Sequence, residues 1–229
     1  MCGRFTLTSS PEALARHFDL DELPQLAPRY NVAPGQDVAA IRRPVSGGQR
    51  TLELLRWGLV PSWAVDPRVG QRMINARAET AAERPAYRKA LRQRRCLVAA
   101  DGFYEWAGGR GARQPYHIGF ADGGPFGIAG LWAHWIGRGG EVIESCTLLT
   151  TRANERVARL HDRMPVILPP EDYALWLDPS VREVEQVLPL LRPCAAEALE
   201  VRPVSHQVND PKHDDPSCIA RVEPPLTLL

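Results

Sequence analysis

RCLVAADGFYEW, residues 95–106, is the most informative stretch for the architecture of this chain. It predicts a strand that runs into a tight turn at Asp101-Gly102. The residues before it, 79–95, predict a helix despite Pro85. Sheet strands are predicted after it, with glycines that indicate close backbone approaches, in QPYHIGF (114–120) and PFGIAGLWAHW (125–135).

The rest of the chain continues this pattern of strands joined by short turns. Ser9-Ser10 and Pro11 predict the start of a helix over 10–18. Further strands are predicted at 37–43, 49–60 and 145–151, and further helices at 153–161, 170–178 and 181–191. The turn SGG separates the first two of these strands. Because βαβ alternation, internal repeats and long linkers are absent, we expect one α+β domain over residues 1–229 with mainly antiparallel sheet.

The five cysteines indicate reduced thiols in a cytoplasmic protein, because their number is odd, their spacing is wide and no CxxC occurs. We expect no metal and no cofactor: the spacings of Cys194, His206, His213 and Cys218 fit no standard zinc finger. The sequence has neither an apolar run of about 18 residues nor a signal pattern, so we expect no membrane contact.

The net charge of +1 conceals an uneven distribution. Residues 1–115 hold 18 basic and 11 acidic residues, whereas residues 116–229 hold 10 and 16. The densest basic stretch, Glu83 to Arg95, indicates either a solvated helix face or a patch that attracts a polyanion. Only Lys89 and Lys212 are lysines among the 28 basic residues, so few ε-amines could form an imine.

The N-terminal stretch MCGRFT places a cysteine at position 2. Removal of Met1, which a small second residue favours, would leave Cys2 with an α-amine and a thiol on adjacent carbons. The alternative is that Cys2 begins a first strand and buries its thiol in the core.

Four stretches contain candidate functional residues, and each also has an ordinary structural interpretation. Asn75 and Arg77 face the same side of an extended segment, or make a turn contact. Glu105 lies between two aromatic residues, which would raise its pKa and suit proton transfer, or it is exposed on an alternating strand. His161 and Arg163 precede a proline at a predicted helix end. Trp57 and Trp63 belong to the core or stack on exposed bases.

In combination with MCGRF, these stretches resemble the SRAP (SOS response-associated peptidase) family. The similar blocks run in the family's order from residue 1 to about 220. They are MCGRFT, RYNVAPGQ, RWGLVPSWA, INARAET, RCLVAADGFYEW, PYHI, AGLWAHW, TLLTTRAN, HDRMPVIL and, more loosely, VND and PKHDDPSCI. One departure is Ala99, where the family often has proline; it changes no candidate catalytic residue.

The resemblance implies a barrel-like core with peripheral helices and a basic cleft in which Cys2 meets single-stranded DNA containing an abasic site. It also implies a thiazolidine crosslink with the sugar aldehyde. The chemistry of the residue agrees, since about 10–15% of an α-amine is neutral at pH 7, compared with about 0.04% of a lysine. The thiol of the same residue can then close a five-membered ring.

The resemblance assigns roles to the other candidates as well. Glu105 would act as general acid and base, His161 would carry a second proton, and Asn75 would orient the amine and sugar. Phosphates would be held by Arg4, Arg77 and Arg163. The gap left by the missing base would be lined by Trp63 and Met73. The family name further implies proteolytic release of Met1 or a longer leader.

Two other classes of function stay open at this point. An N-terminal-nucleophile amidohydrolase would use the thiol of Cys2 on an amide, although no downstream Gly-Asn-Gly pattern accompanies it. A non-catalytic single-strand binding module would leave Cys2 without a chemical role. We expect a monomer that associates with the nucleoid through DNA.

Overall fold

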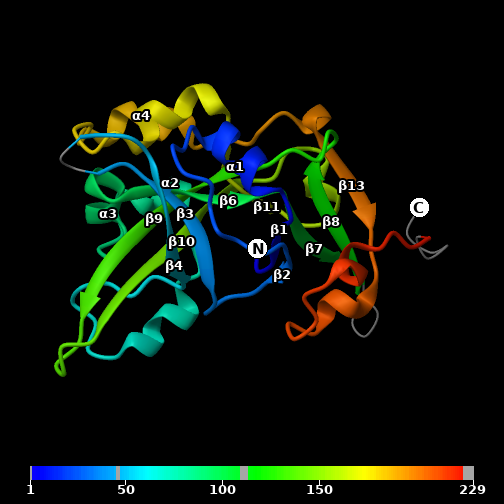
Figure 1. The fold of residues 1–229 in the computed structure, drawn as a ribbon, viewed down its shortest axis with the longest axis horizontal. Coiled ribbons are helices and arrows are strands. Elements are labelled where there is room, and N and C mark those ends of the chain that lie inside the picture. The colour runs from blue at the N-terminus through cyan, green and yellow to red at the C-terminus, as the bar shows by residue number, and fades with distance from the viewer. Residues whose placement is uncertain (1, 45–46, 109–112, 224–229) are drawn as a thin grey trace.

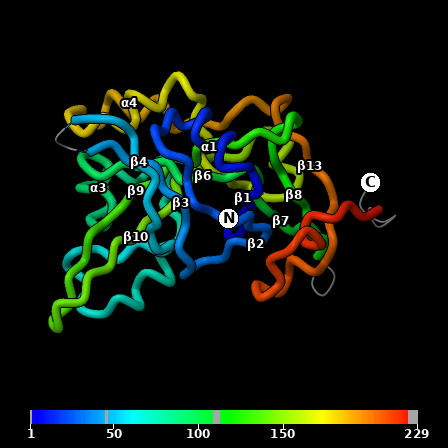
Figure 2. The backbone as a smooth tube through the Cα atoms, viewed as in Figure 1, coloured from blue at the N-terminus to red at the C-terminus, as the bar shows by residue number. Residues whose placement is uncertain are grey.

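The computed structural model describes residues 2–44, 47–108 and 113–223 and contains two sheets (Figures 1 and 2). The first two strands lie near the centre of the view, with the larger sheet to their left and the remaining strands of the smaller sheet to their right. The predicted α+β class with mainly antiparallel sheet is confirmed.

Five strands of the larger sheet close into a barrel in the described part of the chain. Their order is β10-β4-β3-β6-β9, and β9 pairs again with β10. All neighbours are antiparallel except β10 and β4. The predicted barrel-like core is therefore confirmed. The barrel strands are β3 (Asp37–Arg42), β4 (Thr51–Trp57), β6 (Arg95–Ala100), β9 (Phe126–Ile136) and β10 (Val142–Arg152). Shorter strands extend this sheet: β5 (Asn75–Arg77), β11 (Arg163–Pro165) and β12 (Ile167–Leu168).

The smaller sheet is antiparallel throughout and has the order β13-β8-β7-β1-β2. Its strands come from both ends of the chain, so it brings the N-terminal and C-terminal regions together. They are β1 (Phe5–Leu7), β2 (Arg29–Val32), β7 (Gly102–Ala107), β8 (Gln114–Phe120) and β13 (Leu199–Pro203).

The Asp101-Gly102 step connects the two sheets instead of closing a hairpin. It carries the chain from β6 in the barrel to β7 in the smaller sheet. The Asp101 carboxylate accepts hydrogen bonds from the Thr6 hydroxyl (2.6 Å) and the Ser9 backbone N–H (2.8 Å). A Cβ on Gly102 would lie 2.0 Å from Nε2 of His117, so only glycine fits beside that ring.

Period-two alternation along the strands divides the buried side chains into two large clusters. One contains Val98 and Leu148 of the barrel, Phe5 and Phe103 of the smaller sheet, and Cys2. The other contains the opposite faces of the barrel strands and the apolar sides of four helices. Cys2 is thus packed where the two sheets meet.

Helices cover the outside of the barrel and are shorter than the sequence suggests. The helix predicted over 10–18 is confirmed, with Ser10 accepting a cap hydrogen bond from Ala13 N–H. The single helix predicted over 79–95 is wrong, because turns that include Pro85 separate two short helices. The helices predicted over 153–161 and 181–191 are also wrong: both segments form turns and 3-10 helices. The α-helices are α1 (Pro11–Phe18), α2 (Ala78–Ala81), α3 (Arg88–Gln93) and α4 (Tyr173–Leu177). The 3-10 helices are η1 (Pro67–Arg72), η2 (Val157–Arg159), η3 (Pro170–Asp172), η4 (Val184–Gln186), η5 (Leu188–Leu190), η6 (Ala196–Ala198), η7 (His206–Asn209) and η8 (Pro216–Ile219).

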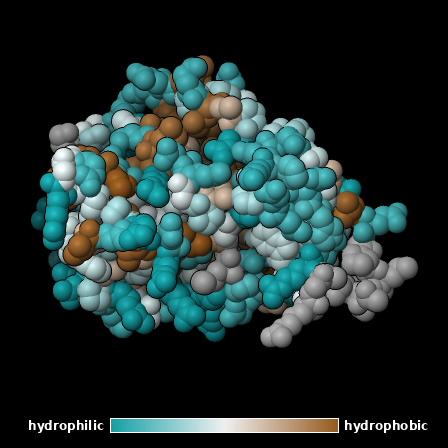
Figure 3. Space-filling view, turned by 90° about the horizontal axis from the view of Figure 1, so that it is seen from below, coloured by the Kyte–Doolittle hydropathy of each residue, from teal (hydrophilic) through white to brown (hydrophobic). Residues whose placement is uncertain are grey.

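Hydrophilic residues cover most of the face seen from below, and its hydrophobic side chains form several separate patches (Figure 3). Within the described ranges, every helix is too short or too polar to cross a bilayer.

Candidate active site

Cys2 lies three residues before the start of β1, at the junction of the two sheets. The backbone N–H of Tyr104 donates to the carbonyl of Arg4 at 3.0 Å, which continues the β1–β7 ladder toward the N-terminus. The Cys2 side chain is fully buried against a cluster that includes Phe5 and Trp57. The thiol is therefore in the core, as the alternative interpretation expects, and its neighbours determine whether it is also placed for chemistry.

Asn75 holds the backbone of Cys2 from the neighbouring strand β5. That strand runs parallel to β10, with Asn75 opposite Leu148. The Nδ2 group of Asn75 donates to the Cys2 carbonyl at 2.7 Å. The Oδ1 atom of Asn75 is buried and accepts no hydrogen bond from the described residues. The amide thus fixes residue 2 and keeps an acceptor for one further donor.

Glu105 lies on β7, where it pairs with Tyr116 of β8. Its side chain is buried, and burial raises its pKa above the usual range for a glutamate. Burial also raises the pKa of the Cys2 thiol strongly, and the negative charge of Glu105 raises it further. The two groups are therefore close enough to interact electrostatically. Cys2 is kept as a thiol, and Glu105 can hold a proton near neutral pH more readily than an exposed glutamate.

His161 follows η2 and supplies a second titratable group to the same place. Its Nδ1 atom lies 3.0 Å from the backbone nitrogen of Arg163 and 2.9 Å from Oδ1 of Asp162. A positive charge on His161 lowers the pKa of Glu105, opposing the effect of burial. Four separate segments thus bring Cys2, Asn75, Glu105 and His161 together.

The three candidate phosphate-binding arginines have different surroundings. Arg77 is exposed on β5, two residues from Asn75. Arg163 is buried and donates to both carboxylate oxygens of Glu79, at 2.7 and 2.8 Å. Arg4 donates to Oδ1 of Asn31 at 2.7 Å and is half-buried. Of these three arginines, only Arg77 has an exposed side chain. Phosphate binding by Arg4 or Arg163 stays a prediction, and a phosphate there would compete with Asn31 or Glu79 for the guanidinium.

The two residues expected beside the gap left by the missing base, Trp63 and Met73, differ in exposure. The Trp63 side chain is 63% exposed on the loop after β4. Met73 is partly buried against the core cluster beneath the helices. Their loop is tied to the barrel by a hydrogen bond from Leu59 N–H to the Met73 carbonyl at 3.1 Å.

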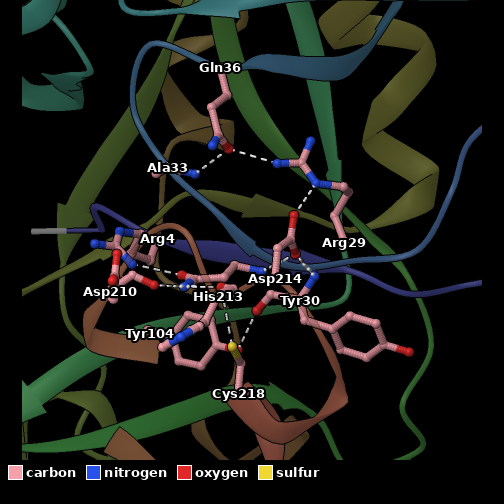
Figure 4. Close-up of polar contacts among 11 residues, drawn as sticks. Arg4, Arg29, Tyr30, Ala33, Gln36, Tyr104, Asp210, His213, Asp214 and Cys218 are labelled. Atoms are coloured by element: carbon pink, nitrogen blue, oxygen red, sulfur yellow. Dashed lines mark hydrogen bonds and ion pairs between the residues drawn. The ribbon is translucent and has the colours of Figure 1, made fainter. Parts of the chain in front are cut away.

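Sequence reasoning missed the residues that join the C-terminal region to the site (Figure 4). Asn31 is fully buried on β2, and its Nδ2 group lies within hydrogen-bond distance of the carbonyls of Val208 (3.2 Å), Asp210 (3.0 Å) and His213 (2.7 Å). Asp214 accepts hydrogen bonds from the backbone and side chain of β2 in return. RYNVAPGQ, VND and PKHDDPSCI, the blocks that contain these residues, are visible in the sequence, but their pairing is not.

In the described ranges, no three His, Cys, Asp or Glu side chains are grouped as metal ligands. The Cys218 thiol instead donates to the His213 carbonyl at 3.4 Å.

Comparisons with known proteins agree with the residue pattern. The sequence profile described as SOS response associated peptidase (SRAP) matches residues 1–211. The chain is 41% identical over 223 residues to the abasic site processing protein YoqW of Bacillus subtilis (strain 168), covering 96% of this chain and 99% of that protein. It is 32% identical over 226 residues to the abasic site processing protein HMCES of Gallus gallus, covering 86% and 67%. In fold, it is similar to a crystal structure of a protein from Bacteroides thetaiotaomicron, with a TM-score of 0.84, 24% identity and coverage of 97% and 100%.

Proposed function

Because the chain belongs to the SOS response-associated peptidase (SRAP) family, we propose that it processes abasic sites by capturing them covalently through residue 2. The substrate is the open-chain aldehyde of an abasic deoxyribose in single-stranded DNA. The observation that carries the proposal is the convergence of Asn75, Glu105 and His161 on a buried cysteine that follows Met1. The relatives named above are abasic site processing proteins, which supports this choice of substrate.

The α-amine of Cys2, released when Met1 is removed, acts first. It attacks C1′ of the aldehyde and gives a carbinolamine, and loss of one water then gives an imine. Glu105 in its protonated form donates the proton that lets the hydroxyl leave as water, and burial favours that form. The buried thiol is the poorer first nucleophile, because its raised pKa keeps it from ionising. The same protonated thiol argues against an amidohydrolase that attacks through sulfur.

The thiol of Cys2 acts second. Its sulfur adds to the imine carbon while its proton passes to the ring nitrogen, directly or through Glu105. The product is a five-membered thiazolidine of N, Cα, Cβ, S and C1′, so the whole reaction joins protein and DNA with the loss of one water. His161 lies beside Glu105 and serves as the second proton carrier, and Asn75 keeps the backbone of residue 2 in place.

Of the peptidase activity in the family name, we propose only cleavage of the peptide bond that precedes Cys2. Release of Met1, or of a longer leader, exposes the aminothiol on which both steps depend. No other peptide bond needs to be cut.

Intact-mass spectrometry of the purified protein, before and after mixing with single-stranded DNA that contains one abasic site, tests the proposal. We expect Met1 to be absent, and the adduct to weigh the sum of the two partners less one water. A glycine inserted between Met1 and Cys2 leaves the thiol in the chain but moves the terminal amine to another residue, so the adduct should disappear. An adduct that survives this insertion would refute the aminothiol mechanism.

A further inference from the structure

A polar pocket lies on the face of the smaller sheet that points away from the candidate active site. Adjacent residues of a strand point to opposite faces of a sheet, so His117, which pairs with Tyr104, lies on the other face from Glu105. Arg202 pairs directly with His117 and shares its face, since β8 and β13 are neighbours at the right of Figure 1. Both residues line the pocket, which has a volume of about 270 Å³. The pocket is therefore separate from Cys2.

His117 supplies this pocket with a hydrogen-bond acceptor. The Thr6 hydroxyl donates its one proton to Asp101 at 2.6 Å, because an ionised carboxylate only accepts. Thr6 can then only accept from Nε2 of His117, which lies 3.1 Å away, so the proton of a neutral ring is on Nε2 and Nδ1 is an acceptor. Burial lowers the pKa of His117 to about 4, so the ring is neutral at pH 7. Within the described ranges nothing donates to Nδ1, which leaves it for a ligand.

Arg202 supplies a positive charge beside this acceptor. Its Nε atom is buried and has no hydrogen-bond partner in the described part of the chain. No carboxylate oxygen of that part lies within 4.0 Å of its guanidinium. A buried donor without a partner is unfavourable, and a ligand carboxylate would satisfy it with a charge-assisted hydrogen bond.

The pocket lining also contains negative charge at its exposed side. Asp122 and Glu200 line the pocket, and both side chains are exposed. A third carboxylate of the lining, Asp101, already accepts hydrogen bonds from Thr6 (2.6 Å) and from the Ser9 backbone (2.8 Å). The two exposed carboxylates therefore remain to attract a positive group, next to a cation that lacks a negative one.

We propose that this pocket binds a free α-amino acid with an apolar side chain. The ligand carboxylate accepts from Arg202, and the adjacent ammonium group donates to Nδ1 of His117 and lies near Glu200. The side chain packs on Phe120 and Ile219, which complete the lining. The volume is just below the roughly 300 Å³ at which pockets for drug-sized ligands begin, so it suits a small metabolite.

The same groups argue against two other classes of ligand. An anion without an ammonium group would be repelled by Asp122 and Glu200. A metal ion would lack ligands, because no three His, Cys, Asp or Glu side chains are grouped for one anywhere in the described ranges. A zwitterion is the class that uses both signs of charge.

The test titrates the full-length protein with leucine and follows its backbone amide signals by NMR. The amides of Gly119 and Gly123, which line the pocket, should shift and saturate. Two analogues are compared with leucine: isocaproate, which lacks the ammonium group, and isopentylamine, which lacks the carboxylate. The variants are Arg202→Gln, Glu200→Gln and, as the matched control, Arg221→Gln. Arg221 is an exposed arginine of the same region that does not line the pocket.

We expect leucine to bind at millimolar concentration and each analogue to bind about tenfold more weakly, because each lacks one charged contact. Arg202→Gln should weaken leucine binding by about tenfold as well, whereas Arg221→Gln should bind as the wild type does. Glu200→Gln should weaken binding about threefold, as for an exposed ion pair, and it keeps the test decisive if Arg202→Gln does not fold.

Three results would each overturn the amino acid site. The first is the absence of saturable shifts at Gly119 and Gly123 with millimolar leucine. The second is equal binding of leucine and isocaproate. The third is wild-type affinity in Glu200→Gln together with either wild-type affinity or loss of folding in Arg202→Gln.

Discussion

At residue 2, the mechanism that we propose makes burial decide which nucleophile acts first. The Cys2 side chain is fully buried, and burial raises the pKa of its thiol, which favours the protonated sulfur. Cys2→Ala removes the sulfur but keeps an α-amine, so we expect the stable adduct to disappear while a borohydride-trappable imine persists. Denaturing gels with and without borohydride measure both species. Alanine substitutions of Cys96, Cys146, Cys194 and Cys218 are the controls and should each leave the adduct intact; its loss in one of them would contradict the assignment.

His117 is a second buried titratable residue, and we expect it to make stability depend on pH. Burial lowers its pKa to about 4, and the charge of Arg202 adds to the effect. The folded state therefore binds this proton less tightly than the unfolded chain, whose histidine titrates near 6.5. Stability should fall as the pH drops from about 6.5 to about 4, by up to about 3 kcal/mol.

Urea unfolding at pH 7 and at pH 4.5 measures this dependence. His117→Gln should lose less stability between the two pH values than the wild-type protein. His206→Gln, at an exposed position, should behave as the wild type. Identical pH dependence in all three proteins would show that His117 is not the responsible group.

At the scale of elements, β5 and β11 carry arginines that the sequence alone cannot distinguish. Arg77 on β5 is exposed, whereas Arg163 on β11 is buried in a bidentate pair with Glu79 of α2. Arg77→Gln should change stability by less than about 0.5 kcal/mol. Its salt slope for single-stranded DNA should become shallower by about 0.7. Arg163→Gln should cost about 2 kcal/mol of stability, because it breaks a charge-assisted pair between two elements.

Thermal unfolding and salt-dependent binding of the two variants, each in a Cys2→Ala background, separate these effects. A stable Arg163→Gln protein with a shallower salt slope would mean that Arg163 is free for phosphate despite Glu79. An unchanged slope in Arg77→Gln would remove Arg77 from the DNA-binding residues.

The sequence predicts elements well where the signals are local. Ser10, the N-cap, and Pro11, the first residue of α1, fix the start of that helix where the sequence predicts it. The strand before Asp101 and the turn at Asp101 also follow from local sequence signals. That the chain passes there from the barrel to the smaller sheet does not. It depends on Thr6 and Ser9, whose hydrogen bonds to Asp101 no sequence pattern reveals. The helix predicted over 79–95 despite Pro85 is wrong, because the chain forms turns around that helix-breaking residue.

The candidate site shows the same limit at the scale of the whole molecule. Cys2, Asn75, Glu105 and His161 could be named from their residue types and from the family resemblance, and the fold brings them together. Their roles stay predictions. The residues that support them could not be named, because Asn31 and the 206–218 segment are far apart in the sequence and meet only in the folded chain.

The two ends of the chain are joined through Asn31, so we expect one buried amide to influence the whole site. Its Nδ2 group lies against three carbonyls of the C-terminal region, and its Oδ1 accepts from Arg4, two residues from Cys2. Asn31→Ala leaves these partners buried without it. We expect a loss of about 3 kcal/mol of stability, at roughly 1 kcal/mol for each hydrogen bond lost.

The same variant should also release the C-terminal segment and slow the capture of DNA, since Arg4 would lose the contact that steadies the strand behind Cys2. Urea unfolding, limited proteolysis within 206–218 and the initial rate of crosslinking measure the three effects. Asp215→Ala is the matched control, because Asp215 caps η8 in the same segment but makes no hydrogen bond to β1 or β2 among the described residues. If Asn31→Ala loses stability but crosslinks at the wild-type rate, the C-terminal segment holds the fold together without positioning residue 2.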